Sequence, residues 1–197
     1  MVDQHEVPTP RQLAAPVRRF DTAVERAFDA LRGKPAIDRV LYTASELGNH
    51  SLIWHLLATA QGLRRDGDLA GTVRLVTIMG LESAIVNGPV KAMFRRQRPV
   101  HDGPRPFRLR QPRTSSFPSG HASAAAVFTV VASEDDALAP VYTALAILVA
   151  SSRIHVRIHH PSDVVGGAVV GTALGFVLRA WWPAGQVLPR GLGRLRR

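Results

Sequence analysis

Apolar residues recur along this chain at the three- and four-residue spacing of an α-helix, beginning in residues 16–32. The apolar positions of this first segment are Val17, Phe20, Val24, Ala27, Phe28 and Leu31. Arginines and acids occupy the opposite face, so the pattern predicts an amphipathic helix that ends near Gly33 and Pro35. Such a helix lies either on a membrane interface or on the surface of a helical bundle, and the pattern leaves both open.

Further mostly apolar segments predict the remaining helices. They cover residues 37–61, 69–94, 119–133, 137–152 and 163–182. The longer segments reach the roughly 20 residues needed to cross a bilayer, whereas the two middle segments are short enough to suit the core of a soluble bundle. No stretch alternates with the period of two that marks a strand. The expected fold class is therefore all-α: a helical bundle embedded in a membrane, with about five spanning helices plus the N-terminal amphipathic helix.

The last of these segments is the most lipid-like. Its glycines have a spacing typical of closely packed membrane helices, and they are Gly166, Gly167, Gly171 and Gly175. Trp181 and Trp182 follow at the end of the segment, where aromatic residues commonly lie at a membrane interface. We therefore expect this helix to pack tightly along one face.

The length of 197 residues fits a single domain. Residues 1–15 contain two prolines and no sustained periodicity, which is typical of a flexible arm. We expect this arm to precede one helical domain over residues 16–183 and a basic C-terminal tail over residues 184–197. The first residues are polar and charged, so we expect no cleaved secretory signal and assign any membrane insertion to the internal helices.

The formal net charge of +10 and the pI near 11.5 indicate anionic partners. Nucleic acid, a phospholipid surface and a phosphate substrate all meet this requirement. The basic residues are spread over the termini and short connections, without a recognition-helix or stacking-platform pattern, so we expect no nucleic-acid partner. The sequence has no cysteine, which excludes disulfides, thiolate metal sites and a cysteine nucleophile.

Three polar blocks interrupt the apolar pattern at the predicted helix junctions. They read K-A-M-F-R-R-Q-R-P over residues 91–99, P-S-G-H over residues 118–121 and S-R-I-H-V-R-I-H-H-P-S-D over residues 152–163. The connection over residues 95–117 is rich in Arg and Pro, and irregular loops longer than about 12–15 residues are usually functional or disordered. Because it joins two of the blocks, we expect this loop to be functional.

In this order the blocks resemble the signature of the phosphatidic acid phosphatase type 2 superfamily, K-x6-R-P, P-S-G-H and S-R-x5-H-x3-D. The signature positions are filled by Lys91, Arg98, Pro99, Pro118, Ser119, Gly120, His121, Ser152, Arg153, His159 and Asp163. The resemblance implies a membrane-embedded helical phosphatase that hydrolyses a phosphomonoester or pyrophosphate of a lipid through a phosphohistidine intermediate. Phosphatidate, phosphatidylglycerophosphate and polyprenyl phosphates are the substrates it suggests, and the sequence does not distinguish them.

The resemblance also assigns roles to the catalytic side chains. His159 would be the nucleophile that becomes phosphorylated, and His121 would be the acid that protonates the leaving oxygen. Imidazole can perform both tasks near neutral pH. Asp163 would accept a hydrogen bond from the nitrogen of His159 that does not attack, which fixes the tautomer of the ring.

The remaining signature residues would bind the phosphate group. Lys91, Arg98 and Arg153 supply positive charge for the equatorial oxygens of a transferring phosphoryl group. Ser119 and Gly120 follow a proline at a predicted helix start, where free backbone N–H groups bind anions. We expect no metal and no cofactor. His155, His159 and Asp163 share a spacing of four that imitates a metal site, but Pro161 interrupts the helix between them.

Other charged residues have simpler interpretations. We expect a solvated basic rim comprising Arg95, Arg96, Arg105, Arg108, Arg110, Arg113 and Arg157. The histidines outside the signature are interpreted as structural, and these are His50, His55, His101, His155 and His160. Glu82 lies within a predicted spanning helix, where an ionisable group is a functional candidate, although it would equally pair with a neighbouring helix.

Three alternatives remain open at this stage. A vanadium-dependent haloperoxidase uses the same residue set but is typically larger and soluble, and a soluble acid phosphatase of the superfamily would need a secretory signal. A non-enzymatic membrane protein with the same fold is disfavoured by the complete signature.

We expect the favoured enzyme to be a multi-pass protein of the cell membrane. Most of the 25 Lys and Arg residues lie on the same side of the predicted bundle as the site, which favours a site that faces the cytoplasm.

Overall fold

The computed structural model describes residues 10–101, 105–109, 111–112, 114–134 and 136–190, and side chains from residue 14 onward. The α-helices in this part of the chain are α1 (Pro10–Asp29), α2 (Pro35–Leu47), α3 (Leu52–Arg64), α4 (Leu69–Ile85), α5 (Gly120–Ala132), α6 (Ala139–His155) and α7 (Pro161–Trp181). A 3-10 turn, η1 (Asn49–Ser51), joins α2 to α3, and a π-helical segment, η2 (Val86–Val90), extends α4. Within the described ranges there is no strand, as the all-α prediction required.

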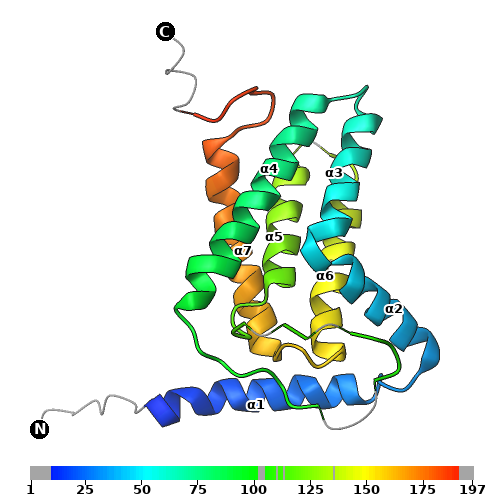
Figure 1. Ribbon diagram of the computed structural model, residues 1–197, viewed down its shortest axis with the longest axis vertical. Helices are drawn as coiled ribbons and strands as arrows, with labels where there is room; N and C mark the ends of the chain where they lie inside the picture. Colours follow the sequence, from blue (N-terminus) through cyan, green and yellow to red (C-terminus); the bar gives the residue numbers. More distant parts are fainter. Residues whose placement is uncertain (1–9, 102–104, 110, 113, 135, 191–197) are drawn as a thin grey trace, which may run out of the picture.

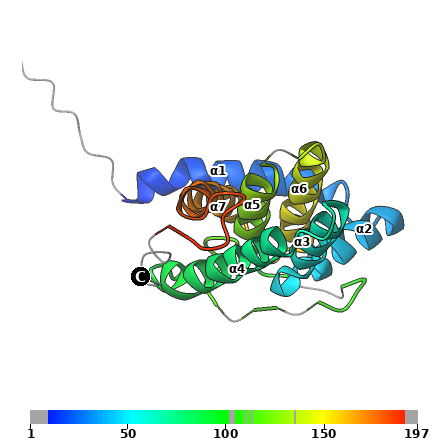
Figure 2. The ribbon, with the colours of Figure 1, turned by 90° about the horizontal axis from the view of Figure 1, so that it is seen from above.

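Helices α3 to α7 run along a common direction, and α1 lies across one end of this bundle (Figure 1). Seen from above, α7, α5 and α6 form a row, with α4 and α3 beside it (Figure 2). The short helix α5 is central and contacts α3, α4, α6 and α7. Its alanine-rich sequence explains this position, because small side chains allow neighbouring helices to approach from several directions.

The main core is built around α5. Phe128 stacks on Trp54 of α3 with ring centroids 5.1 Å apart and meets Tyr142 of α6 edge to face. On the other side of α5, a Cβ atom at Gly171 of α7 would lie 2.3 Å from the carbonyl oxygen of Ser123. Glycine is therefore required where α7 touches α5, as the spacing of glycines predicted.

Two elements are long and apolar enough to cross a membrane among the described residues. They are α4 with η2, over 22 residues, and α7, over 21 residues. On α7 several large apolar side chains face outward, namely Val165, Val169, Phe176 and Val177. The other apolar helices are shorter, and α5 is buried inside the bundle, so among the described residues only these two helices have the length and composition of a span, and the expected five spans are not confirmed.

Several predicted boundaries differ from the structure. The continuous helix expected over residues 37–61 is broken at η1, where His50 and Ser51 adopt positive φ angles of 51° and 58° and the chain kinks. Helix α1 begins at Pro10, inside the arm expected over residues 1–15. Residues 1–9 of that arm and residues 191–197 of the predicted tail lie outside the described part of the chain, as do Arg110 and Arg113 of the predicted basic rim.

Candidate active site

The three sequence blocks meet at the end of the bundle that α1 crosses (Figure 1). Each comes from a helix terminus: the first follows η2, the second begins α5, and the third links α6 to α7. A cavity of about 300 Å³ lies between them. The predicted site residues that line it are Lys91, Arg98, Gly120, His121, Arg153 and His159. Asp163 and Ser119 are fully buried behind this lining.

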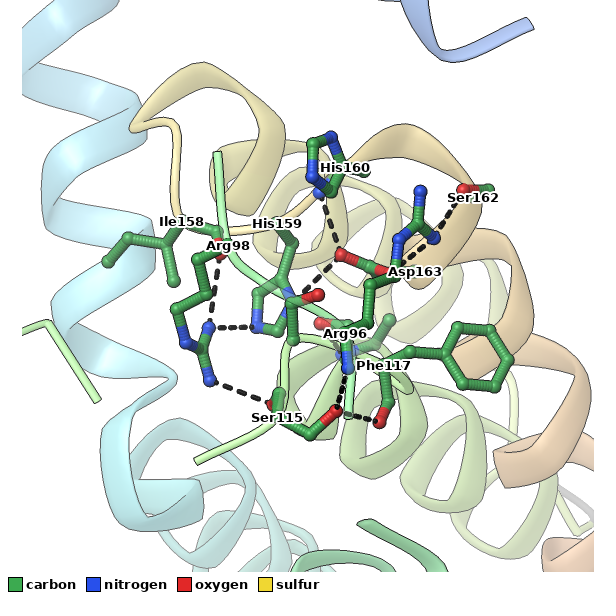
Figure 3. Close-up of polar contacts among 12 residues, drawn as sticks. Arg96, Arg98, Ser115, Phe117, Ile158, His159, His160, Ser162 and Asp163 are labelled. Carbon is green, nitrogen blue, oxygen red and sulfur yellow. Dashed lines mark hydrogen bonds and ion pairs between the residues drawn. The ribbon is translucent and has the colours of Figure 1, made fainter. Parts of the chain in front are cut away.

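His159 lies between a carboxylate and a guanidinium group (Figure 3). Its Nδ1 is 3.6 Å from Oδ2 of Asp163, slightly beyond hydrogen-bonding distance, and its Nε2 is 3.2 Å from Nη1 of Arg98. The backbone N–H of His160 donates to the same Asp163 oxygen at 2.8 Å. The ring therefore turns one nitrogen towards the carboxylate and the other towards a cation of the cavity.

Burial and the nearby charges of Arg153 and Arg98 keep the imidazole of His159 neutral. Together they lower its pKa to about 3, although Asp163 acts in the opposite direction. A neutral imidazole retains a lone pair on Nε2 at physiological pH. His159 is thus in the protonation state that a nucleophile requires.

The cations of the cavity are oriented by neighbouring polar groups. Arg98 donates to the carbonyl oxygens of Ile158 at 3.1 Å and Ser115 at 3.1 Å. The Nζ of Lys91 donates to Oδ1 of Asn87 at 2.8 Å, and Arg153 donates to Oγ of Ser45. These bonds fix cations around an open volume, which suits recognition of a phosphate group.

His121 and Gly120 occupy the first turn of α5. The Nε2 of His121 lies 3.1 Å from the carbonyl oxygen of Ser45, and its ring contacts the backbone of α2 closely. A Cβ at Gly120 would lie 2.8 Å from Oδ1 of Asn87, the atom that accepts from Lys91. Glycine at this position therefore leaves room for the lysine and its partner.

Ser119 was expected to bind the phosphate group, but it does not line the cavity. Its backbone N–H donates to the carbonyl oxygen of Asp163 at 3.0 Å, and its Oγ accepts from the N–H of Ala122 as the N-cap of α5. These bonds tie the start of α5 to the start of α7. Its amide is consequently occupied in the described geometry, and Ser119 holds the position of its neighbours rather than facing the cavity.

The structure adds residues that the sequence did not indicate. Beyond the signature, the cavity is lined by Gly48, His50, Ser51, Glu82, Ser83, Asn87, Pro112, Thr114 and Ala124. His50 was expected to be structural, but the turn at η1 brings it to the cavity. The sequence identifies Glu82 only as an ionisable group within a helix. In the structure its side chain is almost fully buried and lines the same cavity.

Three arginines of the predicted solvated rim have specific partners. Arg96 forms ion pairs of 2.7 Å with Asp163 and of 2.7 Å with Asp21. Arg105 donates to the carbonyl oxygen of Val156, and Arg157 pairs with an acid of α1. The sequence did not indicate the partners of Arg96 and Arg105, because they lie far away along the chain, whereas the exposed pair formed by Arg157 fits a solvated rim.

The potential metal ligands do not converge. Nε2 of His155 lies 2.7 Å from Oδ1 of the buried Asp38, whereas His159 faces Asp163. Among the residues that the structure describes, no group of three or more His, Asp or Glu side chains is arranged to hold a metal ion.

Comparisons with known proteins show which family and fold the chain matches. The sequence model of the PAP2 superfamily matches residues 71–186. The decaprenylphosphoryl-5-phosphoribose phosphatase of Mycolicibacterium smegmatis (strain ATCC 700084 / mc(2)155) is 30% identical over 152 residues, covering 76% of this chain and 82% of that protein. The enzyme of the same name from Mycobacterium tuberculosis (strain ATCC 25618 / H37Rv) is 28% identical over 154 residues, with the same coverage.

A solved structure shares the fold. The crystal structure of a transmembrane PAP2 type phosphatidylglycerolphosphate phosphatase from Bacillus subtilis superposes with a TM-score of 0.62. The match covers 84% of this chain and 85% of that one at 24% sequence identity. The relatives named here are phosphatases, and none is described as a haloperoxidase.

Proposed function

This chain belongs to the PAP2 superfamily and is a phosphatase, and from that premise we propose that it hydrolyses a phosphate ester of a membrane lipid through a phosphohistidine intermediate. The observation that carries the proposal is the position of His159, between Asp163 and Arg98 at the wall of a cation-lined cavity. The cations Lys91 and Arg153 complete the charge that a phosphate group requires.

In the first step, Nε2 of His159 attacks the phosphorus atom, an N–P bond forms and the bond from phosphorus to the leaving oxygen breaks. Asp163 stabilises the positive ring that results. His121 transfers a proton to the leaving oxygen. In the empty site, burial and the positive charges of Arg153 and Lys91 lower the pKa of His121 well below its usual value, and a phosphate dianion in the cavity offsets those charges and so favours the protonated form before this transfer.

In the second step, a water molecule attacks the phosphorus of the phosphohistidine and the N–P bond breaks. His121, now neutral, accepts a proton from this water, which returns it to its starting state. Inorganic phosphate leaves, and His159 is again a neutral imidazole. No metal ion takes part in this sequence, because the charge on the phosphoryl oxygens is balanced by side-chain cations.

The proposed substrate is a polyprenylphosphoryl pentose phosphate. Support for this class comes from the two mycobacterial relatives, which are named for such a substrate and match most of the chain.

We further propose a multi-pass membrane protein, with α4 and α7 among the spanning helices and the site at the membrane surface next to α1. The outward apolar side chains of α7 support this placement.

Release of inorganic phosphate from a panel of lipid phosphates tests the proposal. The panel comprises a polyprenylphosphoryl pentose phosphate, phosphatidylglycerophosphate, phosphatidate and a polyprenyl pyrophosphate, each assayed with and without EDTA. The purified protein should release phosphate fastest from the first substrate, equally in EDTA. Loss of activity in EDTA that a divalent ion restores would count against the metal-independent mechanism.

Substitution of the nucleophile tests the mechanism directly. His159→Ala should abolish turnover, and the matched variant His160→Ala, which changes the adjacent histidine outside the cavity, should retain most activity. Acid-labile ³²P should be trapped on the wild-type protein and not on His159→Ala. Full activity of His159→Ala would refute the phosphohistidine mechanism.

A further inference from the structure

A chain of ion pairs continues from the site to the N-terminal helix. Oδ1 of Asp163 accepts from Nη1 of Arg96 at 2.7 Å, and Nη2 of the same guanidinium group donates to Oδ2 of Asp21 at 2.7 Å (Figure 3 shows Arg96 and Asp163). Asp163 is fully buried and Asp21 is only 6% exposed. The two carboxylates are thus bridged by one arginine with both ends of its planar fork engaged.

Ser162 closes this network into a ring. Its hydroxyl accepts from Nη1 of Arg96 at 2.7 Å and donates to Oδ2 of Asp21 at 2.8 Å. Its backbone N–H donates to the other oxygen of Asp21 at 2.7 Å. Asp21 therefore fixes both the guanidinium group and the first turn of α7, the turn that carries Asp163.

The position of Asp21 on α1 is unusual for an acid. It lies on the buried side of the helix with Val24 and Phe28, which pack against the bundle. A carboxylate removed from water is costly unless charged and hydrogen-bonding partners compensate for the loss of solvent. The partners of Asp21 are Arg96 and Ser162, which also lie beside Asp163. The hydrogen bonds that compensate Asp21 for its loss of solvent therefore connect it to the site.

The bonds leave Asp163 little freedom to rotate. One oxygen is bound by Arg96, and the other accepts from the N–H of His160 while it faces Nδ1 of His159. We propose that Arg96 and Asp21 are positioning residues for the His159 nucleophile, acting through Asp163. The inference rests on the proposed role of His159 and adds two residues on separate elements to its support.

Arg96 has a second consequence for Asp163. Its positive charge favours the ionised carboxylate, the form that stabilises a phosphorylated imidazolium. Without it, the buried carboxylate would have only the N–H of His160 and the histidine itself to hold its orientation. The expected defect is therefore in the chemical step and not in the binding of substrate, because Arg96 does not line the cavity.

Steady-state and single-turnover kinetics test the proposal with four variants of the full-length protein: Arg96→Met, Arg96→Lys, Asp21→Asn and Glu25→Gln. Glu25 is the matched control, since it lies one turn from Asp21 on α1 and pairs with His160 at 3.2 Å without touching Asp163. Arg96→Met and Asp21→Asn should lower kcat and the rate of phosphohistidine formation by about 10–100-fold, by analogy with the loss of a hydrogen-bond partner behind a metal-binding side chain. KM should change by less than about threefold.

The conservative variant separates positioning from folding. Arg96→Lys keeps a positive charge near Asp163 but cannot bridge two carboxylates, so its kcat should fall between wild type and Arg96→Met. Glu25→Gln should match wild type. Far-UV circular dichroism and thermal unfolding identify any variant that fails to fold. If Asp21→Asn fails to fold, the comparison of the two Arg96 variants, which change a loop residue, decides the test.

The outcomes distinguish this inference from the proposed function. If His159→Ala is inactive while Arg96→Met and Asp21→Asn behave like Glu25→Gln, the positioning role is refuted and the mechanism stands. A rise in KM with unchanged kcat in the Arg96 variants also refutes it, because that would indicate substrate binding. If His159→Ala is fully active, the mechanism itself is wrong.

Discussion

Lys91 is the cation of the site whose charge is most sensitive to pH. Its side chain is buried, and this burial together with the charges of Arg98 and Arg153 lowers its pKa to about 8. Below that pH the ammonium group is charged and available to a phosphate oxygen. As the pH rises through about 8 the empty site loses this charge, whereas the arginines keep theirs.

We expect kcat/KM to fall above about pH 8, approaching tenfold per pH unit, because this parameter reports ionisations of the free enzyme. Lys91→Arg should move the decline to higher pH, even if its maximal rate is lower. The measurement is kcat/KM between pH 6 and 10. Lys34→Arg, which changes an exposed lysine before α2, serves as the control. An unchanged alkaline decline in Lys91→Arg would assign the ionisation to another group.

At the scale of single residues, the sequence identified the six cavity-lining residues that lie at signature positions, because each signature block is short and its residue types indicate its chemistry. Lys91, His121 and His159 could all be identified in this way, and their catalytic roles stay predictions until the kinetics are measured. The partnership of Arg96 with Asp21 could not, since 75 positions separate them and neither lies at a signature position. Only the docking of α1 across the end of the bundle brings this pair together.

Helices α5 and α7 show how small residues determine an element's place. Gly171 approaches the backbone of Ser123 so closely that no side chain fits between them. Gly80 of α4 provides the contrast, because a Cβ at that position meets nothing within 4 Å. The same residue type is therefore essential in one helix and dispensable in another.

Gly171→Ala should destabilise the fold by about 1–3 kcal/mol, the usual cost of overpacking, and should lower activity because α7 carries Asp163. Gly80→Ala should instead stabilise its helix by about 0.5–1 kcal/mol, since alanine has the higher helix propensity. Thermal unfolding of both variants in the same detergent measures the difference. Equal shifts of Tm in the same direction would contradict the close packing of α5 and α7.

The elements themselves were predictable where apolar periodicity was sustained, as in α4, α6 and α7. The break between α2 and α3 was not, because the apolar pattern continues across it and the left-handed conformations fall on His50 and Ser51 rather than on a glycine. The helix predicted over residues 69–94 spans both α4 and η2 and is not a continuous α-helix. Gly88 and Pro89 convert its last turn into η2, although the apolar pattern continues to Val90.

For the whole molecule, the outward apolar surface of α7 and the basic site lie in different places. Large apolar side chains face outward on α7, and the basic site lies at the end where α1 crosses the bundle. This distribution suits a bundle inserted in a membrane with its site at one surface. From the distribution of Lys and Arg residues near the spanning helices we predict that this surface faces the cytoplasm.

Single cysteines test this orientation, because the native sequence has none. Val100 at the site end and Val187 beyond α7 are 79% and 77% exposed. For a cytoplasmic site, a membrane-impermeant thiol reagent added to intact cells should label Val187→Cys, and label Val100→Cys only after permeabilisation. Labelling of Val100→Cys but not Val187→Cys in intact cells would place the site outside.

The volume of the cavity, about 300 Å³, limits which part of a lipid the enzyme can recognise. It lies at the lower end of small-molecule pockets, so we expect the cavity to hold the phosphorylated headgroup and the polyprenyl chain to remain outside it. Tail length should therefore have little influence on turnover. Short-chain, water-soluble analogues would then be adequate for inhibitor screening, and an effective inhibitor would need only the features of the headgroup.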